Sequence, residues 1–145
     1  MTPDQFRELC RGAAQLLELS DLDALFFAAD VRVAGVKVGV FHEDEYDSGG
    51  VYCYADLGAI EPDANSTHLM EEVLALNLEL DAALGEVIGI ERLSRHLVLR
   101  ARLVESGEAI HAGQLVEQLR NYAALANELY EHVLADLTRP TGQAA

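Results

Sequence analysis

The chain has 145 residues, half of them apolar, and a formal net charge of −15 from 25 acidic and 10 basic residues. This length predicts a single domain over residues 1–145 with a core that needs no disulfides, and the apolar content argues against disorder. The charge argues against nucleic acid and anionic lipid as partners, because both are bound through Lys and Arg. It permits a basic protein partner or simply keeps the domain soluble.

The cysteine content and the hydropathy point to the cytoplasm. Cys10 and Cys53 are too few for a disulfide framework and are expected to be reduced. The longest apolar run, near residues 24–29, is far shorter than the roughly 18 residues that cross a membrane. The first ten residues lack the features of a cleavable signal. We therefore expect a cytoplasmic protein without membrane insertion.

The opening stretch, TPDQFRELCRGAAQLLEL, predicts a helix. Thr2 suits the N-cap, Pro3 the first helical position, and Gln5 the position that completes a capping box. Apolar residues then recur at spacings of three and four, which gives the helix one apolar face. That face carries Phe6, Leu9, Ala13, Leu16 and Leu17.

Three strand-like runs follow, at residues 25–33, 36–43 and 51–57. In the third run, Cys53 alternates in phase with Val51, Ala55 and Leu57, as an inward-facing strand residue does. The short connections between the runs predict an antiparallel meander.

The second half predicts a helix, two strands and a helix. The helix over residues 66–84 carries more apolar surface than one sheet contact needs, and Gly85 is placed to end it. Strands are expected at residues 86–91 and 96–104, a last helix at 110–137, and a flexible tail at 138–145. The order helix, three strands, helix, two strands, helix predicts an α+β domain with a five-stranded, mainly antiparallel, twisted sheet.

No residue pattern indicates catalysis or a cofactor. A reactive cysteine needs a neighbouring cation or a helix N-terminus, whereas the charges near Cys53 in the sequence are acidic. The five histidines show no metal-ligand spacing, and the acidic run at residues 43–47 lacks the spacing of a calcium loop. Phosphate-binding and nucleophile-elbow motifs are absent from the sequence. We therefore expect no enzyme, no metal and no cofactor.

Set in this order, several stretches resemble the CesT (Tir chaperone) family of type III secretion chaperones. They are the opening helix FRELCRGAAQLLEL, the strand VYCYADLGAI, and the helix–glycine–strand LMEEVLALNLELDAALGEVIGIE. Particular marks are Leu57-Gly58, the LALN of Leu74–Asn77, and Gly85 followed by IGIE. The resemblance extends over residues 6–137.

The resemblance implies a bacterial cytoplasmic homodimer with no catalytic residues. Such a chaperone holds the N-terminal segment of a secreted effector in extended form for delivery to the secretion apparatus. Helix 66–84 is then the expected dimer contact, although its apolar residues could instead face the sheet of their own subunit: Met70, Leu74 and Leu78. The expected effector contacts, for which core packing is the alternative, are Phe6, Leu9, Leu17, Phe26, Val38, Phe41 and Tyr54.

Two other functions fit the sequence. An acidic regulatory or inhibitor protein could cover a basic surface of a folded partner. A small enzyme could use Cys53 with a histidine brought near it by folding. Arg100 and Arg102 could bind an acidic group, or they could be solvated strand residues.

Overall fold

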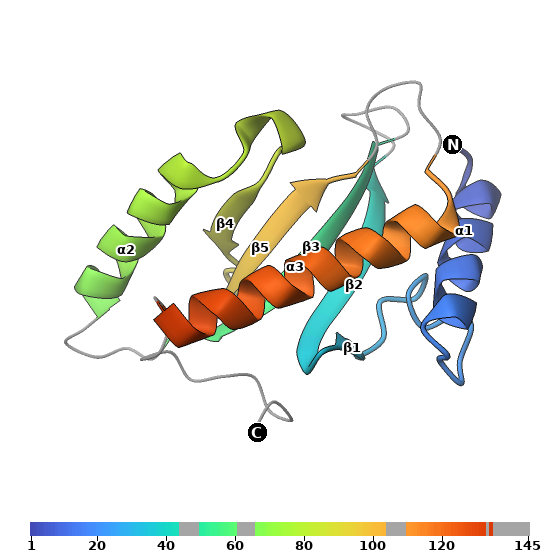
Figure 1. Cartoon of the computed structure of the whole chain (residues 1–145), viewed down its shortest axis with the longest axis horizontal. Coiled ribbons are helices and arrows are strands. Elements are labelled where there is room, and N and C mark those ends of the chain that lie inside the picture. Colours follow the sequence, from blue (N-terminus) through green and yellow to red (C-terminus); the bar gives the residue numbers. More distant parts are fainter. Residues whose placement is uncertain (44–49, 61–65, 104–109, 133, 135–145) are drawn as a thin grey trace.

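The computed structural model describes residues 1–43, 50–60, 66–103, 110–132 and 134. Its elements confirm the predicted α+β fold, with a five-stranded antiparallel sheet in the order β1-β2-β3-β5-β4 (Figure 1). The elements in chain order are α1 (Pro3–Leu16), β1 (Val31–Val33), β2 (Val36–Glu43), β3 (Gly50–Ala59), α2 (Ser66–Glu79), the 3₁₀-helix η1 (Ala82–Leu84), β4 (Val87–Ile90), β5 (His96–Arg102) and α3 (Ala112–His132).

The predicted start of α1 is confirmed in detail. The Gln5 backbone N–H donates to Thr2 Oγ1 at 3.2 Å, and the Thr2 backbone N–H donates to Gln5 Oε1 at 2.8 Å. This capping box satisfies two backbone donors that the first turn of a helix leaves free. Phe6, Leu9 and Cys10 are then buried along one face of the helix.

Alternation along the strands gives the sheet one buried face. Val40 lies opposite Cys53, and Cys53 lies opposite Ala101, so these three side chains meet in the core. Helices α1 and α3 cover this face, whereas α2 lies beyond the β4 edge (Figure 1). The other face of the sheet, called the outer face below, is not covered by α1 or α3. No described helix is long and apolar enough to span a bilayer.

Two of the sequence features that resemble the family, Leu57-Gly58 in β3 and Gly85 after α2, have structural reasons. The pairing of β3 with β5 shifts register between Asp56 and Gly58, where Gly58 adopts a φ of 109°. The Gly58 N–H donates to Asp56 Oδ1 at 2.8 Å, which stabilises this bulge. Gly85 caps η1 with a φ of 62°, a left-handed conformation that glycine adopts without steric cost.

The expectation of one strand over residues 25–33 is wrong for residues 25–30. The chain turns there: the Phe27 N–H donates to the Asp23 carbonyl at 3.0 Å, and the Ala29 N–H donates to the Ala24 carbonyl at 2.8 Å. Ala28 has a φ of 55°, which a strand does not allow. As a result Phe27 is 65% exposed, while Leu25 is buried.

Two helix boundaries also differ from the expectation. Helix α2 ends at Glu79, five residues early, because the Asp81 side chain accepts from the Ala83 N–H at 2.9 Å and begins η1. Gly85 therefore ends η1 rather than α2. Helix α3 ends at His132 and Leu134 is not helical; the rest of the expected helix end and the tail at 138–145 lie outside the described residues.

Candidate functional site

The outer face of the sheet carries aromatic and basic side chains in adjacent register. Phe41 lies opposite Tyr52, and Tyr52 lies opposite Arg102. The rings of Phe41 and Tyr52 are stacked with centroids 5.1 Å apart and planes 8° apart. The Arg100 guanidinium lies 5.5 Å from the centroid of the Tyr52 ring. Three neighbouring strands thus contribute one continuous stack, in which ring stacking and a cation–π contact fix the side chains.

Beside this stack the outer face is hollowed into a cavity of about 660 Å³, called the outer-face hollow below. Tyr54 lies opposite Gly39, and its half-buried ring occupies the space that a larger residue at Gly39 would fill. Burial raises the pKa of Tyr54. The residues lining the hollow are Lys37, Phe41, Tyr54, Asp56, Glu91, Ser94, His96, Val98 and Arg100.

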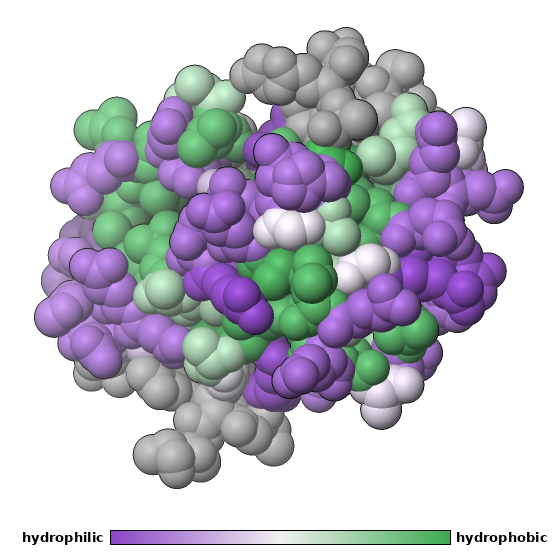
Figure 2. Space-filling model, turned by 45° about the vertical axis from the view of Figure 1, so that its right-hand side comes forward, coloured by the Kyte–Doolittle hydropathy of each residue, from purple (hydrophilic) through white to green (hydrophobic). Residues whose placement is uncertain are grey.

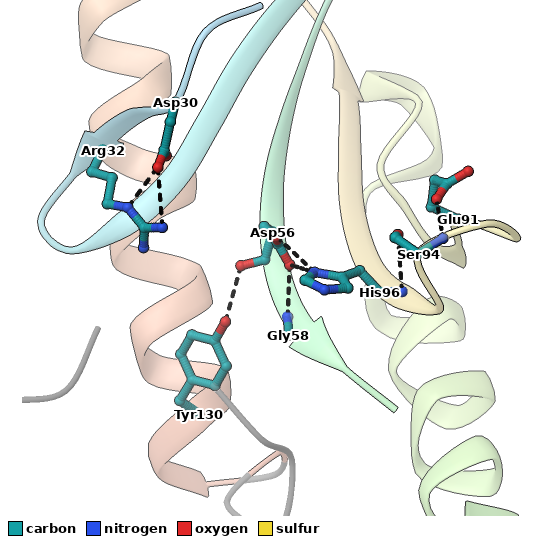
Figure 3. A network of polar contacts seen from close by, with 8 residues as sticks. All are labelled: Asp30, Arg32, Asp56, Gly58, Glu91, Ser94, His96 and Tyr130. Carbon is teal, nitrogen blue, oxygen red and sulfur yellow. Dashed lines mark hydrogen bonds and ion pairs between the residues drawn. The ribbon is translucent and has the colours of Figure 1, made fainter. Parts of the chain in front are cut away.

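The two acidic residues of the outer-face hollow are engaged within the subunit (Figure 3). Asp56 Oδ2 lies 2.8 Å from His96 Nδ1, and Oδ1 accepts from the Gly58 N–H. Glu91 accepts from the Ser94 N–H at 2.7 Å and from the Leu93 N–H at 3.3 Å. The hydrogen bonds from Ser94 lower the pKa of Glu91. These carboxylates stabilise the bulge and the β4–β5 turn.

The two basic residues of the hollow are placed differently. Among the described residues, neither Lys37 nor Arg100 forms an ion pair. Arg100 is exposed and Lys37 is half-buried. The hollow therefore combines aromatic walls with two cations that form no ion pair with a described carboxylate.

A second aromatic group, called the α1 cluster, lies between α1 and the turn at residues 21–28. Phe6 is 5.9 Å from Phe26, and Phe26 is 5.0 Å from Phe27, between ring centroids. The Arg7 guanidinium lies 5.3 Å from the Phe26 ring and 5.4 Å from the Phe27 ring. Figure 2, which brings the α1 side of Figure 1 forward, shows apolar surface between hydrophilic side chains.

Asp23 fixes the turn that carries this cluster. Its carboxylate accepts from Arg7 Nη2 at 3.0 Å and from Arg11 Nε at 2.9 Å. Hydrogen bonds from Arg7 and Arg11 hold the pKa of Asp23 well below its usual range, because they favour the ionised form. This link ties α1 to residues 21–28, where a turn replaces part of the expected strand.

The structure distributes the seven residues expected to contact an effector over different environments. Phe6, Leu9 and Val38 are buried in the core. Leu17 and Phe26 are half-buried near α1, while Phe41 and Tyr54 line the outer-face hollow. Val38 and Tyr54 face opposite sides of the sheet, so the seven do not form one surface.

The three residues expected at a dimer contact also differ from one another. Met70 packs partly against the core, whereas Leu74 is 70% exposed and Leu78 is 90% exposed. Six of the eight large apolar side chains that the described residues expose lie in one part of the chain, called the α2–β4 surface: Leu74, Leu78, Leu84, Val87, Ile90 and Leu93. The sequence analysis missed Leu93, whose signal is an isolated leucine in the polar turn ERLSR.

Asn77 attaches this surface to the sheet. Its side-chain amide donates to the Ile88 carbonyl at 2.9 Å, and its carbonyl accepts from the Ile88 N–H at 2.7 Å. These two bonds occupy the outward-facing backbone groups of Ile88 on the β4 edge strand. Asn77, the last residue of the LALN stretch, thus holds α2 against β4.

Neither cysteine is placed as a nucleophile. Burial raises the pKa of Cys53 to about 12 and that of Cys10 to about 12. A thiol with such a pKa is almost fully protonated at neutral pH. In the part of the chain that the structure describes, no group of three or more His, Cys, Asp or Glu side chains is arranged to hold a metal ion.

Comparison with known proteins agrees with this fold. The model of the Tir chaperone protein (CesT) family matches residues 13–130. A search of curated proteins found no match.

Proposed function

Because the chain belongs to the Tir chaperone protein (CesT) family, we propose that it binds the N-terminal segment of a secreted effector as a homodimer. Family membership makes the chain a type III secretion chaperone, and members of this family are chaperones rather than enzymes. In the proposed function the dimer works in the bacterial cytoplasm. It keeps the effector segment extended and unaggregated, and then delivers it to the secretion apparatus.

The α2–β4 surface supports the homodimer. Exposed apolar side chains on a folded chain are favourable sites for association, because pairing removes them from water. Leu74, Leu78 and Leu93 are the most exposed of the set. A two-fold pairing places the same surface of each copy against the other, so the exposed leucines of α2 on the two copies can meet in a closed dimer.

The two edges of the sheet support different roles. At β4, Asn77 already occupies the backbone N–H and C=O of Ile88. At β1, no hydrogen bond from another described element reaches the backbone of Val31–Val33, apart from those of its pairing with β2. An extended effector segment that adds a strand to the sheet therefore has its free edge at β1.

The accessible aromatic surfaces support the effector contacts. Leu17 and Phe26 are half-buried, after the end of α1 and in the turn at residues 21–28, whereas Phe41 and Tyr54 line the outer-face hollow. The remaining three expected contacts are buried in the core that supports these surfaces: Phe6, Leu9 and Val38. A segment that crosses from the α1 cluster to the outer face would meet both groups.

The test is capture of partners from the native host with the tagged chain, followed by binding of the N-terminal roughly hundred residues of each captured protein. Retention of that fragment alone by two copies of the chain supports the proposal. Retention that requires a folded downstream domain, and that is lost at moderate salt, overturns it in favour of an acidic inhibitor of a basic surface.

The dimer has its own test in sedimentation equilibrium. The wild-type chain should sediment at twice its 15.8 kDa mass. Leu78→Glu should reduce that mass to one copy, because it places a charge in the apolar contact. Leu16→Glu is the matched control, since Leu16 is 53% exposed but lies on α1. A wild-type monomer, or a Leu78→Glu dimer, would contradict the assignment of this surface.

A further inference from the structure

We propose that the outer-face hollow binds an acidic side chain of the effector segment, with Lys37 and Arg100 as its cationic partners. This inference rests on the proposed function and specifies the chemistry that one of its surfaces selects. A chain of net charge −15 would ordinarily repel an acidic segment. Within the hollow, however, two cations without an ion pair offer a local site for a carboxylate.

The acids of the outer-face hollow are already bound by neighbours in the same subunit. Asp56 contacts His96 and the Gly58 N–H, and Glu91 accepts the N–H groups of the β4–β5 turn. Lys37 and Arg100 form no ion pair with a described residue. Both acids are thus already hydrogen-bonded within the subunit, whereas both cations can still pair with the carboxylate of a ligand.

Arg100 is prepared for this role by its contact with Tyr52. The guanidinium lies over the ring at 5.5 Å, so stacking restricts the long side chain before any ligand binds. A stacked guanidinium keeps its N–H groups in the plane of the fork, where they can donate to the two oxygens of a carboxylate. Restriction in the free protein lowers the entropy lost on binding.

The apolar walls of the hollow determine which residues of the bound peptide flank its acidic residue. Phe41, Tyr54 and Val98 line the same hollow, and its volume of about 660 Å³ accommodates several side chains. A single free anion would leave these walls exposed to water. The occupant that satisfies both the cations and the walls is an extended peptide with one acidic residue between apolar residues.

The probes are two fluorescein-labelled nine-residue peptides that differ at one position, one with glutamate and the other with glutamine between two leucines. Their affinities for the full chain are measured by fluorescence anisotropy, and backbone amide shifts locate the contact. The glutamate peptide should bind about fivefold to tenfold more tightly, because its hydrogen bonds to Lys37 and Arg100 are charge-assisted. The shifts should be centred on β2, β3 and β5.

Variants assign the preference to these cations. Arg100→Gln and Lys37→Gln should each reduce the glutamate preference to within about twofold of equality, while the affinity for the glutamine peptide is kept. Arg120→Gln, an exposed cation on α3, is the matched control and should leave the preference unchanged.

Equal affinity of the wild-type chain for the two peptides, or failure of both to bind, would overturn this inference. A preference that survives in Arg100→Gln and Lys37→Gln would overturn it as well. In each of these cases, retention of the captured effector fragment would leave the proposed function standing. The reverse result, a glutamate preference without effector capture, would contradict the proposed function alone.

Discussion

The ring of Tyr54 on β3 occupies the space beside Gly39 on β2, where a Cβ atom at position 39 would overlap the phenol. Gly39 is thus required for a close contact across the strands rather than for an unusual backbone conformation. The contact places Tyr54 in the wall of the outer-face hollow. The shape of this hollow depends on the absence of one methyl group.

Replacing this glycine should destabilise the fold. Gly39→Ala should lower the free energy of unfolding by about 1–3 kcal/mol, because the ring or the strand must move. Gly89→Ala is the control, since a Cβ atom there meets nothing within 4 Å, and it should change stability by less than about 0.5 kcal/mol. Urea denaturation measures both, and equal effects at the two sites would contradict the account of the Tyr54 contact.

Removing the Asn77 side-chain amide, which holds β4, should also destabilise the fold. Asn77→Ala should lower the free energy of unfolding by about 1–3 kcal/mol, because it leaves two backbone groups of Ile88 without partners. Asn77→Asp keeps the acceptor for the Ile88 N–H and loses only the donor. It should therefore protect the Ile88 amide from hydrogen exchange better than Asn77→Ala does. Equal hydrogen-exchange protection of the Ile88 amide in Asn77→Asp and Asn77→Ala would show that the side chain at position 77 does not accept a hydrogen bond from this amide.

The stability contribution of Asp23 should depend on pH. Its pKa is lowered in the folded protein by Arg7 and Arg11, so its stabilisation is fully present above the ordinary carboxyl pKa of about 4. The contribution is lost as the pH falls below that value towards the lowered pKa. Asp23→Asn should therefore be less stable than the wild type at pH 7, with a difference that narrows between about pH 4 and pH 2.

Urea midpoints across this pH range measure that difference. Glu8→Gln, which removes an exposed acid from α1, is the control and should track the wild type. A gap between Asp23→Asn and the wild type that stays constant down to pH 2 would contradict the assignment of the effect to this carboxylate.

Both thiols should be inert in the folded protein. With a pKa of about 12, roughly one thiol in ten thousand is ionised at pH 8, compared with about a quarter of an ordinary cysteine. Labelling of the single-cysteine variants Cys10→Ala and Cys53→Ala by a disulfide reagent should be at least about a hundredfold slower in buffer than in guanidinium chloride. Rapid labelling of native Cys53, with a pH midpoint below 8, would instead support the enzyme interpretation.

The regular elements could be predicted because their side-chain pattern has a strict period. In β2, β3 and β5 a buried apolar residue recurs at every second position over most of each strand, and the short connection between β2 and β3 favours antiparallel pairing. The segment at residues 25–30 is apolar from Leu25 to Ala29 and was expected to belong to a strand, but it forms a turn. A carboxylate at Asp23, bound by two arginines of α1, bends the chain just before it. Contacts of this kind join residues 12 and 16 positions apart, and they leave no periodic signal in the sequence.

The candidate sites were harder to predict for a related reason. An apolar residue on a strand or helix has the same sequence signal whether it faces its own core, a second copy or a partner. Val38 and Tyr54 illustrate the difficulty, since both were expected to contact an effector and the structure places them on opposite faces of the sheet. Only the packing of α1 and α3 on one face distinguishes them.

The central claim is that the dimer holds an effector segment in extended form. The most direct measurement is the heteronuclear NMR spectrum of an isotopically labelled effector N-terminal fragment bound to the unlabelled chain, with the stoichiometry fixed by native mass spectrometry. The account predicts two copies of the chain per fragment, with fragment amides protected along extended stretches and few contacts within the fragment itself. A bound fragment that keeps its own globular core, or a complex with one copy of the chain, would contradict it.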